Sequence, residues 1–145
     1  MKIEDFKLSK KDQKKIIKAI KKAEKNTSGE IRVHIDTGSS QNHYETAVKL
    51  FESLNMHETE QRNGVLFHVS PKDHNFTIIG DIGIHQVAPD NFWDEINVVV
   101  LKKFKKQKFT KGLTKGIKMA GKALKKHFPY QEGDVNELPD EITWS

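Results

Sequence analysis

Five oxygen-bearing side chains stand at the ends of predicted strands or at the start of a predicted helix, where they could hold a hard cation. They are Glu30, Asn63, Asp81, Asp90 and Asp94. Ca²⁺ and Mg²⁺ bind several oxygen ligands at about 2.0–2.6 Å, which carboxylates and an amide carbonyl supply. The alternative is that they are solvated acids, one of which caps a helix while another complements a helix dipole. The spacing contains no EF-hand loop, so only the fold could bring these ligands together.

Three β-rich runs supply the strands that would position this group. Residues 30–36 alternate between apolar and polar side chains, which is typical of a half-buried strand. Runs 65–69 and 76–79 are separated by a short turn, so they should pair as an antiparallel hairpin. A predicted helix that opens at Asn42 joins the first run to the second. The first two strands should therefore form a parallel, right-handed βαβ unit.

This strand arrangement predicts where the acids lie. Parallel strands begin at the same edge of a sheet, so Glu30 and Gly64 should start side by side. The third strand runs the other way, and Asp81 at its end should return to that edge. Asp90 and Asp94 open the next predicted helix and could lie close by. We therefore expect the acids and Asn63 to converge on one cation site.

Helical periodicity predicts four helices, of which the third opens near Pro89 and the fourth at Phe109. The order αβαββαα predicts an α/β fold, a three-layer α/β/α sandwich with a small mixed β-sheet flanked by helices on both faces. We expect a single domain over residues 1–128, followed by an acidic C-terminal tail over residues 129–145. Apolar residues of this tail could dock it on the domain.

The net charge of +5 conceals a strong segregation along the chain. Residues 1–30 contain ten lysines and five acids, whereas residues 31–101 contain four basic residues and ten acids. Residues 102–127 contain eleven lysines and no acid, and residues 131–145 contain five acids and no base. The basic character therefore belongs to helix surfaces, and the middle of the chain is acidic.

The composition excludes several classes of site. Cysteine is absent, which excludes disulfides, thiolate metal sites and cysteine nucleophiles. No apolar run approaches the roughly 20 residues of a membrane-spanning helix, and the first residues lack the apolar core of a signal peptide. We expect a cytoplasmic protein without a membrane span, and a monomer.

The lysine-rich run from Lys102 to Lys126 is the main competing signal. Such a run could neutralise phosphates of a nucleic acid. However, it contains only Phe104 and Phe109 as aromatic residues, both at positions expected to be buried, and no nucleic-acid motif accompanies it. A solvated helix surface, with lysine stems covering the edges of the core, is the simpler interpretation. Nucleic acid is therefore not the expected partner.

Three other residues are candidate site residues. Asp36 lies at the opposite sheet edge, beside a loop of small hydroxyl residues that could hold a cation or a phosphate, although an ordinary turn is the simpler interpretation. His85 follows the segment around Asp81 and could contact a phosphate. Trp93 stands near the start of the predicted third helix, where core packing is the usual role of a tryptophan.

Four segments, in order, resemble the TPM domain family. They are SGEIRVHI at residues 28–35, RNGVLFHVS at 62–70, IIGDIGIH at 78–85 and KFTKGLTKGIKMA at 108–120. The resemblance implies an α/β/α sandwich, divalent metal binding in some members and weak acid phosphatase activity in some members. The family commonly has an aromatic residue between the two glycines of its Gly-x-Gly motif, where this chain has Asp81. An added carboxylate there would strengthen a cation site.

These observations predict a TPM-like domain that binds a divalent cation, calcium or magnesium, at the acidic strand edge. In a stronger form of this hypothesis the domain is a weak metal-dependent phosphatase acting on a small phosphorylated substrate. Asp81 or Asp90 would then take the proton from the attacking water. The alternative is a non-catalytic interaction module whose lysine-rich helix face binds polyanions or an acidic partner.

Overall fold

The computed structural model describes residues 8–131 and 140–145. The elements follow in the order α1 (Lys10–Glu24), β1 (Glu30–Ile35), α2 (His43–Ser53), β2 (Gly64–Ser70), β3 (Asn75–Gly80), α3 (Ile82–His85), α4 (Asp94–Lys105), α5 (Phe109–His127) and β4 (Thr143–Trp144).

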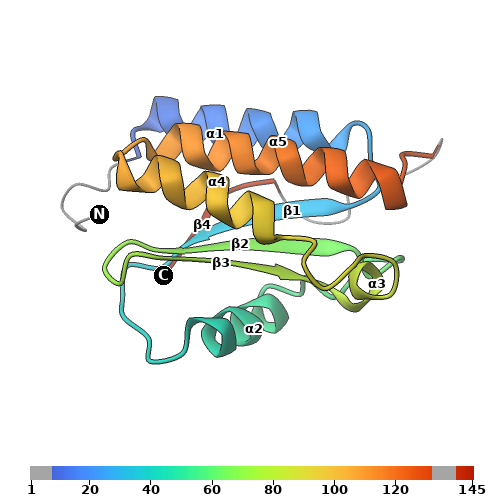
Figure 1. Cartoon of the computed structure of the whole chain (residues 1–145), viewed down its shortest axis with the longest axis horizontal. Helices are drawn as coiled ribbons and strands as arrows, with labels where there is room; N and C mark the ends of the chain where they lie inside the picture. The colour runs from blue at the N-terminus through green and yellow to red at the C-terminus, as the bar shows by residue number, and fades with distance from the viewer. Residues whose placement is uncertain (1–7, 132–139) are drawn as a thin grey trace.

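The strands form one mixed sheet in the order β3-β2-β1-β4. Strand β1 is parallel to β2 and to β4, and β2 pairs with β3 in the antiparallel sense. Helices α1, α4 and α5 cover one face of the sheet, and α2 covers the other (Figure 1). The predicted three-layer α/β/α sandwich, with helices on both faces of a small mixed sheet, is confirmed.

The alternation of side chains along the strands divides the core between the two faces. Ile31, Val33 and Ile35 of β1 pack with the helices α1, α4 and α5 in the larger cluster. Leu66 of β2 and Phe51 of α2 belong to a smaller cluster on the other face. Burying one such side chain contributes about 1.5–3 kcal/mol. The face of the sheet that α2 covers therefore has the smaller apolar core, and polar side chains occupy more of this face than of the opposite one.

The segment before α4 differs from the prediction. The helix begins at Asp94 rather than near Pro89, and residues 89–93 form turns. Phe92 N donates to the Pro89 carbonyl at 3.0 Å, and Asp94 N donates to the Asn91 carbonyl at 3.1 Å. These three-residue turns replace helical hydrogen bonds, and Trp93 at the N-cap position offers no side-chain cap. A short helix that was not predicted, α3, precedes this segment.

The described end of the acidic tail belongs to the sheet. Thr143 and Trp144 pair with His34 and Ile35 of β1 in the parallel sense. The Ile142 side chain packs against the larger core cluster. Val135 and Leu138, the other apolar tail residues considered for docking, lie outside the described residues.

In the described part of the chain, no helix has both the length and the apolar character needed to cross a bilayer.

Candidate functional site

The sheet register brings three of the predicted ligands to one edge. Glu30 pairs with Gly64 across β1 and β2, and its backbone N donates to the Asn63 carbonyl at 3.4 Å. Asp81 N donates to the Gly64 carbonyl at 3.0 Å. Exposure of Glu30, Asn63 and Asp81 is only 3%, 1% and 7%. The expected convergence of strand ends therefore holds for these three residues.

Gly64 separates the two carboxylates on this edge. Side chains alternate along a strand, so Glu30 and Asp81 both belong to the face of the sheet that α2 covers. Between them, Gly64 has no side chain, and a Cβ there would lie 2.8 Å from the Met56 carbonyl oxygen. Two buried carboxylates, a backbone carbonyl and the Asn63 amide thus share one edge. They are oxygen donors of the kind that hard cations prefer.

Arg62 is the charge partner of Asp81. Its Nε donates to Asp81 Oδ2 at 2.7 Å, and its Nη2 donates to Oδ1 at 2.9 Å. Such a bidentate pair is among the strongest side-chain hydrogen bonds, and the bond to Asp81 raises the pKa of the Arg62 guanidinium. The Arg62 side chain is nevertheless 48% exposed, whereas that of Asp81 is 7% exposed. The pair therefore has one buried and one accessible partner.

Helix α3 fixes the position of this pair. Asp81 Oδ1 also accepts the N–H of Ile82 at 2.7 Å and so caps α3. Gly83 N donates to the Arg62 carbonyl at 2.9 Å. A Cβ on Gly83 would lie 2.1 Å from the Gln61 carbonyl oxygen, so only glycine allows this approach. Arg62 itself adopts a positive φ of 51°, a conformation that few non-glycine residues adopt.

The loop before β2 is tied to the start of β1. Asn63 Nδ2 donates to Ser28 Oγ at 3.2 Å, and Gln61 Nε2 donates to the same oxygen at 3.1 Å. The Asn63 backbone N donates to Thr59 Oγ1 at 3.3 Å. This network holds Asn63 next to the acids. It also gives the Asn63 amide a structural role that the sequence did not indicate.

A cavity of about 520 Å³ opens beside Asp81. Its lining residues come from α2, the loop after it and the end of β3; they are Tyr44, Val48, Phe51, Glu52, His57, Arg62, Ile79, Gly80 and Asp81. The Nδ1 atom of His57 is buried without a hydrogen-bond partner in the described structure. The cavity thus combines the Asp81–Arg62 ion pair with apolar lining residues, which is the usual composition of a small-molecule site. The sequence did not point to His57 or Glu52.

Asp90 and Asp94 are not gathered into this group. Both are exposed, and Asp94 is the first residue of α4, on the face of the sheet opposite α2 (Figure 1). Residues 8–131 and 140–145 contain no group of three or more histidine, aspartate or glutamate side chains that could hold a metal ion. The convergence of all five predicted ligands is therefore not seen, because the chain between α3 and α4 turns toward the other face.

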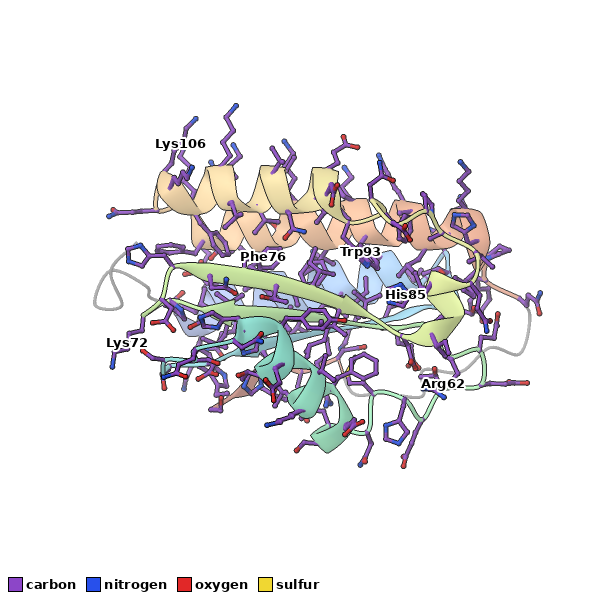
Figure 2. The ribbon with its side chains drawn as sticks, turned by 60° about the horizontal axis from the view of Figure 1, so that its bottom comes forward. Arg62, Lys72, Phe76, His85, Trp93 and Lys106 are labelled. Atoms are coloured by element: carbon purple, nitrogen blue, oxygen red, sulfur yellow. The ribbon has the colours of Figure 1, made fainter. Side chains whose placement is uncertain are left out.

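His85 is exposed, whereas Trp93 belongs to the core. His85 Nε2 lies 3.0 Å from the Gly80 carbonyl oxygen, within hydrogen-bonding distance. Trp93 is 9% exposed, belongs to the larger core cluster and would contact a Cβ on Gly80 at 3.0 Å. Figure 2 shows His85 and Arg62 at one end of the sheet and Trp93 between β3 and α4. Core packing, the usual role of such a tryptophan, is confirmed for Trp93.

Asp36 belongs to a separate polar cluster at the other end of the sheet. Its Oδ1 accepts the N–H of Gly38 at 2.9 Å, and its Oδ2 lies 3.4 Å from Nε2 of the buried His68. Nearby, Asp73 accepts bonds from Ser39 Oγ and Ser40 N, both at 2.9 Å. The bonds from Ser40 and then Ser39 lower the pKa of Asp73. These contacts tie the loop after β1 to the β2–β3 turn.

The same cluster holds the tail. Nδ1 of His34 lies 2.6 Å from Thr143 Oγ1, and Nε2 lies 2.7 Å from Ser145 Oγ. Burial, and next the stacked ring of His68 at 5.9 Å, lowers the pKa of His34 to about 4. The neutral imidazole thus bonds two hydroxyl groups of β4 and its flank. Sequence alternation placed His34 on the second face of the sheet but could not show this contact.

Comparisons with known proteins agree with the fold and with the four resembling segments. A family model described as the TPM domain matches residues 5–123, a range that includes all four resembling segments. The NMR structure of BA42 protein from the psychrophilic bacterium Bizionia argentinensis is similar at 43% identity. That match covers 95% of each chain, with a TM-score of 0.90.

A more distant likeness concerns the fold alone. The N-terminal domain of cg2496 protein from Corynebacterium glutamicum is 12% identical, with a TM-score of 0.62. The match covers 90% of this chain and 82% of that one. The comparison with curated proteins found no match.

Proposed function

The chain belongs to the TPM domain family, and from that premise we propose that it binds a divalent cation, Ca²⁺ or Mg²⁺, at the edge formed by Glu30, Asn63 and Asp81. The observation that carries the proposal is the buried Asp81 carboxylate, whose charge is balanced by the half-exposed Arg62. Family membership supports the cation, since the resemblance implies divalent metal binding in some members.

The donor set fits a hard cation. Glu30 and Asp81 would supply carboxylates, and Asn63 would supply an amide oxygen. The Met56 carbonyl oxygen lies beside Gly64, the residue between the two acids. Calcium and magnesium accept such ligands together with water molecules. No cysteine is present, and the three proposed ligand side chains offer oxygen rather than imidazole donors, which disfavours softer transition metals.

In this proposal Arg62 is an internal counter-ion that the cation replaces. A guanidinium neutralises the buried carboxylate when no cation is bound, because an unpaired buried charge is costly. A cation at Asp81 and the guanidinium compete for the same two oxygens. Arg62 can leave because its side chain is half exposed. Its release places a bidentate anion-binding group beside the cavity of about 520 Å³.

The cavity favours a second, dependent function, the binding of a small phosphorylated compound. The released guanidinium of Arg62 and the imidazole of His57 would hold the phosphoryl oxygens, and Phe51 would contact the apolar part. When bound, the cation polarises a phosphoryl oxygen. Of the two acids predicted as general base, Asp81 lines the cavity and Asp90 does not. An Asp81 oxygen that the cation leaves free would accept the proton from the water. Hydrolysis of p-nitrophenyl phosphate that is abolished by EDTA and by Asp81→Asn would support this function; hydrolysis unaffected by both would contradict it.

Isothermal titration calorimetry with CaCl₂ and MgCl₂ tests the primary function. We expect saturable binding to the native chain and a loss of at least about tenfold in affinity for Asp81→Asn, which removes one charge but keeps the side-chain shape. Asp94→Asn is the matched control, because it removes the same charge from an exposed position on α4. Equal affinity for all three proteins would place any cation elsewhere.

A further inference from the structure

A hollow of about 800 Å³ lies on the helical side of the sandwich, and Glu30, Asn63 and Asp81 are not among its lining residues. It runs along α5 and is bordered by α1 and by one residue of α4. Its lining residues are Ala19, Lys22, Ala23, Asn26, Lys103, Lys111, Thr114, Lys115, Lys118, Met119, Gly121, Lys122 and Lys125. We refer to it as the lysine groove.

The groove has an apolar floor and a charged rim. Ala19, Ala23 and Met119 are partly buried and pack against the larger core cluster. Seven lysines form the rim, and no acid is among the described residues that line it. Lysine stems are apolar, so they extend the floor while their ammonium groups stay in water.

The rim charges have no compensation within residues 8–131 and 140–145. None of these seven lysines forms an ion pair with a described carboxylate. Burial, and after it the neighbouring Lys108, Lys115, Lys106 and Lys111, lowers the pKa of Lys103. Crowding of like charges means that an anionic partner would relieve repulsion as well as gain attraction.

We propose that the lysine groove binds an acidic amphipathic helix of a partner protein. Acidic side chains of that helix would meet the lysine rim, and its apolar side chains would enter the floor, as in other helix-in-groove complexes. The rim extends along α5 from Lys111 to Lys125. At a rise of 1.5 Å per residue this distance is about 21 Å, which matches roughly four turns of a bound helix.

The observations favour a helix over the other polyanions. A single-stranded nucleic acid would use aromatic side chains for base stacking, and the lining contains none. An anionic membrane surface would take protruding apolar anchors. The exposed large hydrophobic residues among those described are Tyr44, Ile82, Val87, Val98, Tyr130 and Trp144, none of which lines the groove. The apolar floor of the lysine groove is concave, so it suits apolar side chains that project from a partner helix.

Fluorescence anisotropy with a synthetic peptide tests the proposal. The probe is a labelled 18-residue peptide with leucines at i, i+3, i+4 and i+7 spacing and glutamates on its other face. A scrambled peptide of the same composition is its control. In 150 mM NaCl we expect the amphipathic peptide to bind at least about tenfold more tightly than the scrambled one.

Two charge-matched variants locate the binding surface. Lys118→Glu with Lys122→Glu reverses two charges of the groove, and we expect a further loss of at least about tenfold. Lys49→Glu with Lys72→Glu reverses two charges outside its lining and should leave the affinity unchanged. Circular dichroism confirms that each variant keeps its helices.

Several outcomes would overturn the proposal. Equal binding of amphipathic and scrambled peptides would show plain charge attraction without use of the floor. Equal losses in both double variants would place the peptide elsewhere. Groove-dependent binding of phosphatidylglycerol vesicles or oligo-dT, without binding of the amphipathic peptide, would assign the surface to a membrane or a nucleic acid. These measurements do not depend on cation binding at Asp81.

Discussion

The Arg62 guanidinium holds both oxygens of the Asp81 carboxylate, with Nε 2.7 Å from Oδ2 and Nη2 2.9 Å from Oδ1. The carboxylate is buried and the guanidinium is half exposed. This asymmetry decides which partner can move: the acid stays at the strand end, and the arginine can turn to solvent. A cation that reaches the edge therefore has to compete with Arg62 for Asp81.

Arg62→Met should raise the affinity for calcium about tenfold, because it removes the competing positive charge from Asp81. Without calcium, the same variant should unfold at a lower urea concentration than the native chain, since Asp81 loses its hydrogen-bonded partner. Calorimetry measures the first effect, and urea unfolding with and without CaCl₂ measures the second.

Lys72→Met is the control for this pair of measurements. It also removes one positive charge, but Lys72 lies at the opposite end of the sheet from Arg62 (Figure 2). Calcium affinity and stability should stay close to those of the native chain. An unchanged or lower affinity in Arg62→Met would show that Arg62 does not compete with the cation.

Gly83→Ala should destabilise the edge itself. The added Cβ would lie 2.1 Å from the Gln61 carbonyl oxygen and 2.6 Å from that of Arg62, so the backbone must shift. Overpacking of this kind costs about 1–3 kcal/mol, which urea unfolding can measure. Gly38→Ala is the control, because a Cβ there meets only an ordinary contact with Asp36 Oδ1 at 3.4 Å. Equal stability of the two variants would contradict the tight approach of α3.

Glu24 makes the stability depend on pH. Its Oε2 accepts the N–H of Ile31 at 2.8 Å. Burial, and next the hydrogen bond with Asp140 of the tail, raises the pKa of Glu24 from 4.5 to about 9. Between these values the folded chain keeps a proton that the unfolded chain loses. The free energy of unfolding should therefore fall as pH rises from about 4.5 to about 9, by at most about 1.4 kcal/mol per pH unit.

Glu24→Gln tests this dependence. A neutral amide takes the place of the protonated carboxyl group, so thermal unfolding between pH 5 and pH 9 should show a flatter profile than that of the native chain. Extended below pH 4.5, the native and variant profiles should converge, because Glu24 is then largely protonated in the unfolded state as well. Parallel profiles over the whole range would mean that Glu24 ionises normally in the folded chain.

The sequence predicted the positions of Glu30 and Asp81 in the fold, because these depend on strand direction alone. Alternation over residues 30–36 and the short turn before β3 define the register, and that register places Glu30 and Asp81 at the same edge. The placement of Trp93 in the core also followed from its type and its neighbours.

The remaining features depend on contacts between residues distant in sequence. The prediction of Asp94 as a ligand depends on a helix that starts near Pro89. In the structure, consecutive turns precede the helix, which begins at Asp94 and lies on the other face of the sheet. Arg62 pairs with Asp81, 19 residues further along the chain, and adopts a positive φ, and no local pattern indicates either feature. The two residues of β4 are too few for a periodic signal. The segment is attached to β1 by backbone bonds such as that from Ser145 N to the Ile35 carbonyl, and by the contact of His34 with Thr143.

The most direct test of cation binding at Asp81 is a ¹⁵N-HSQC titration with CaCl₂, followed by EDTA. The chain has two arginines, Arg32 and Arg62, so the Nε–H signal of Arg62 can be assigned by comparison with Arg62→Met. We predict saturable shifts at Glu30, Asn63 and Asp81 together with a shift or broadening of that Nε–H signal, all reversed by EDTA. A titration in which the Arg62 Nε–H signal and the edge amides stay unchanged would contradict cation binding at this site.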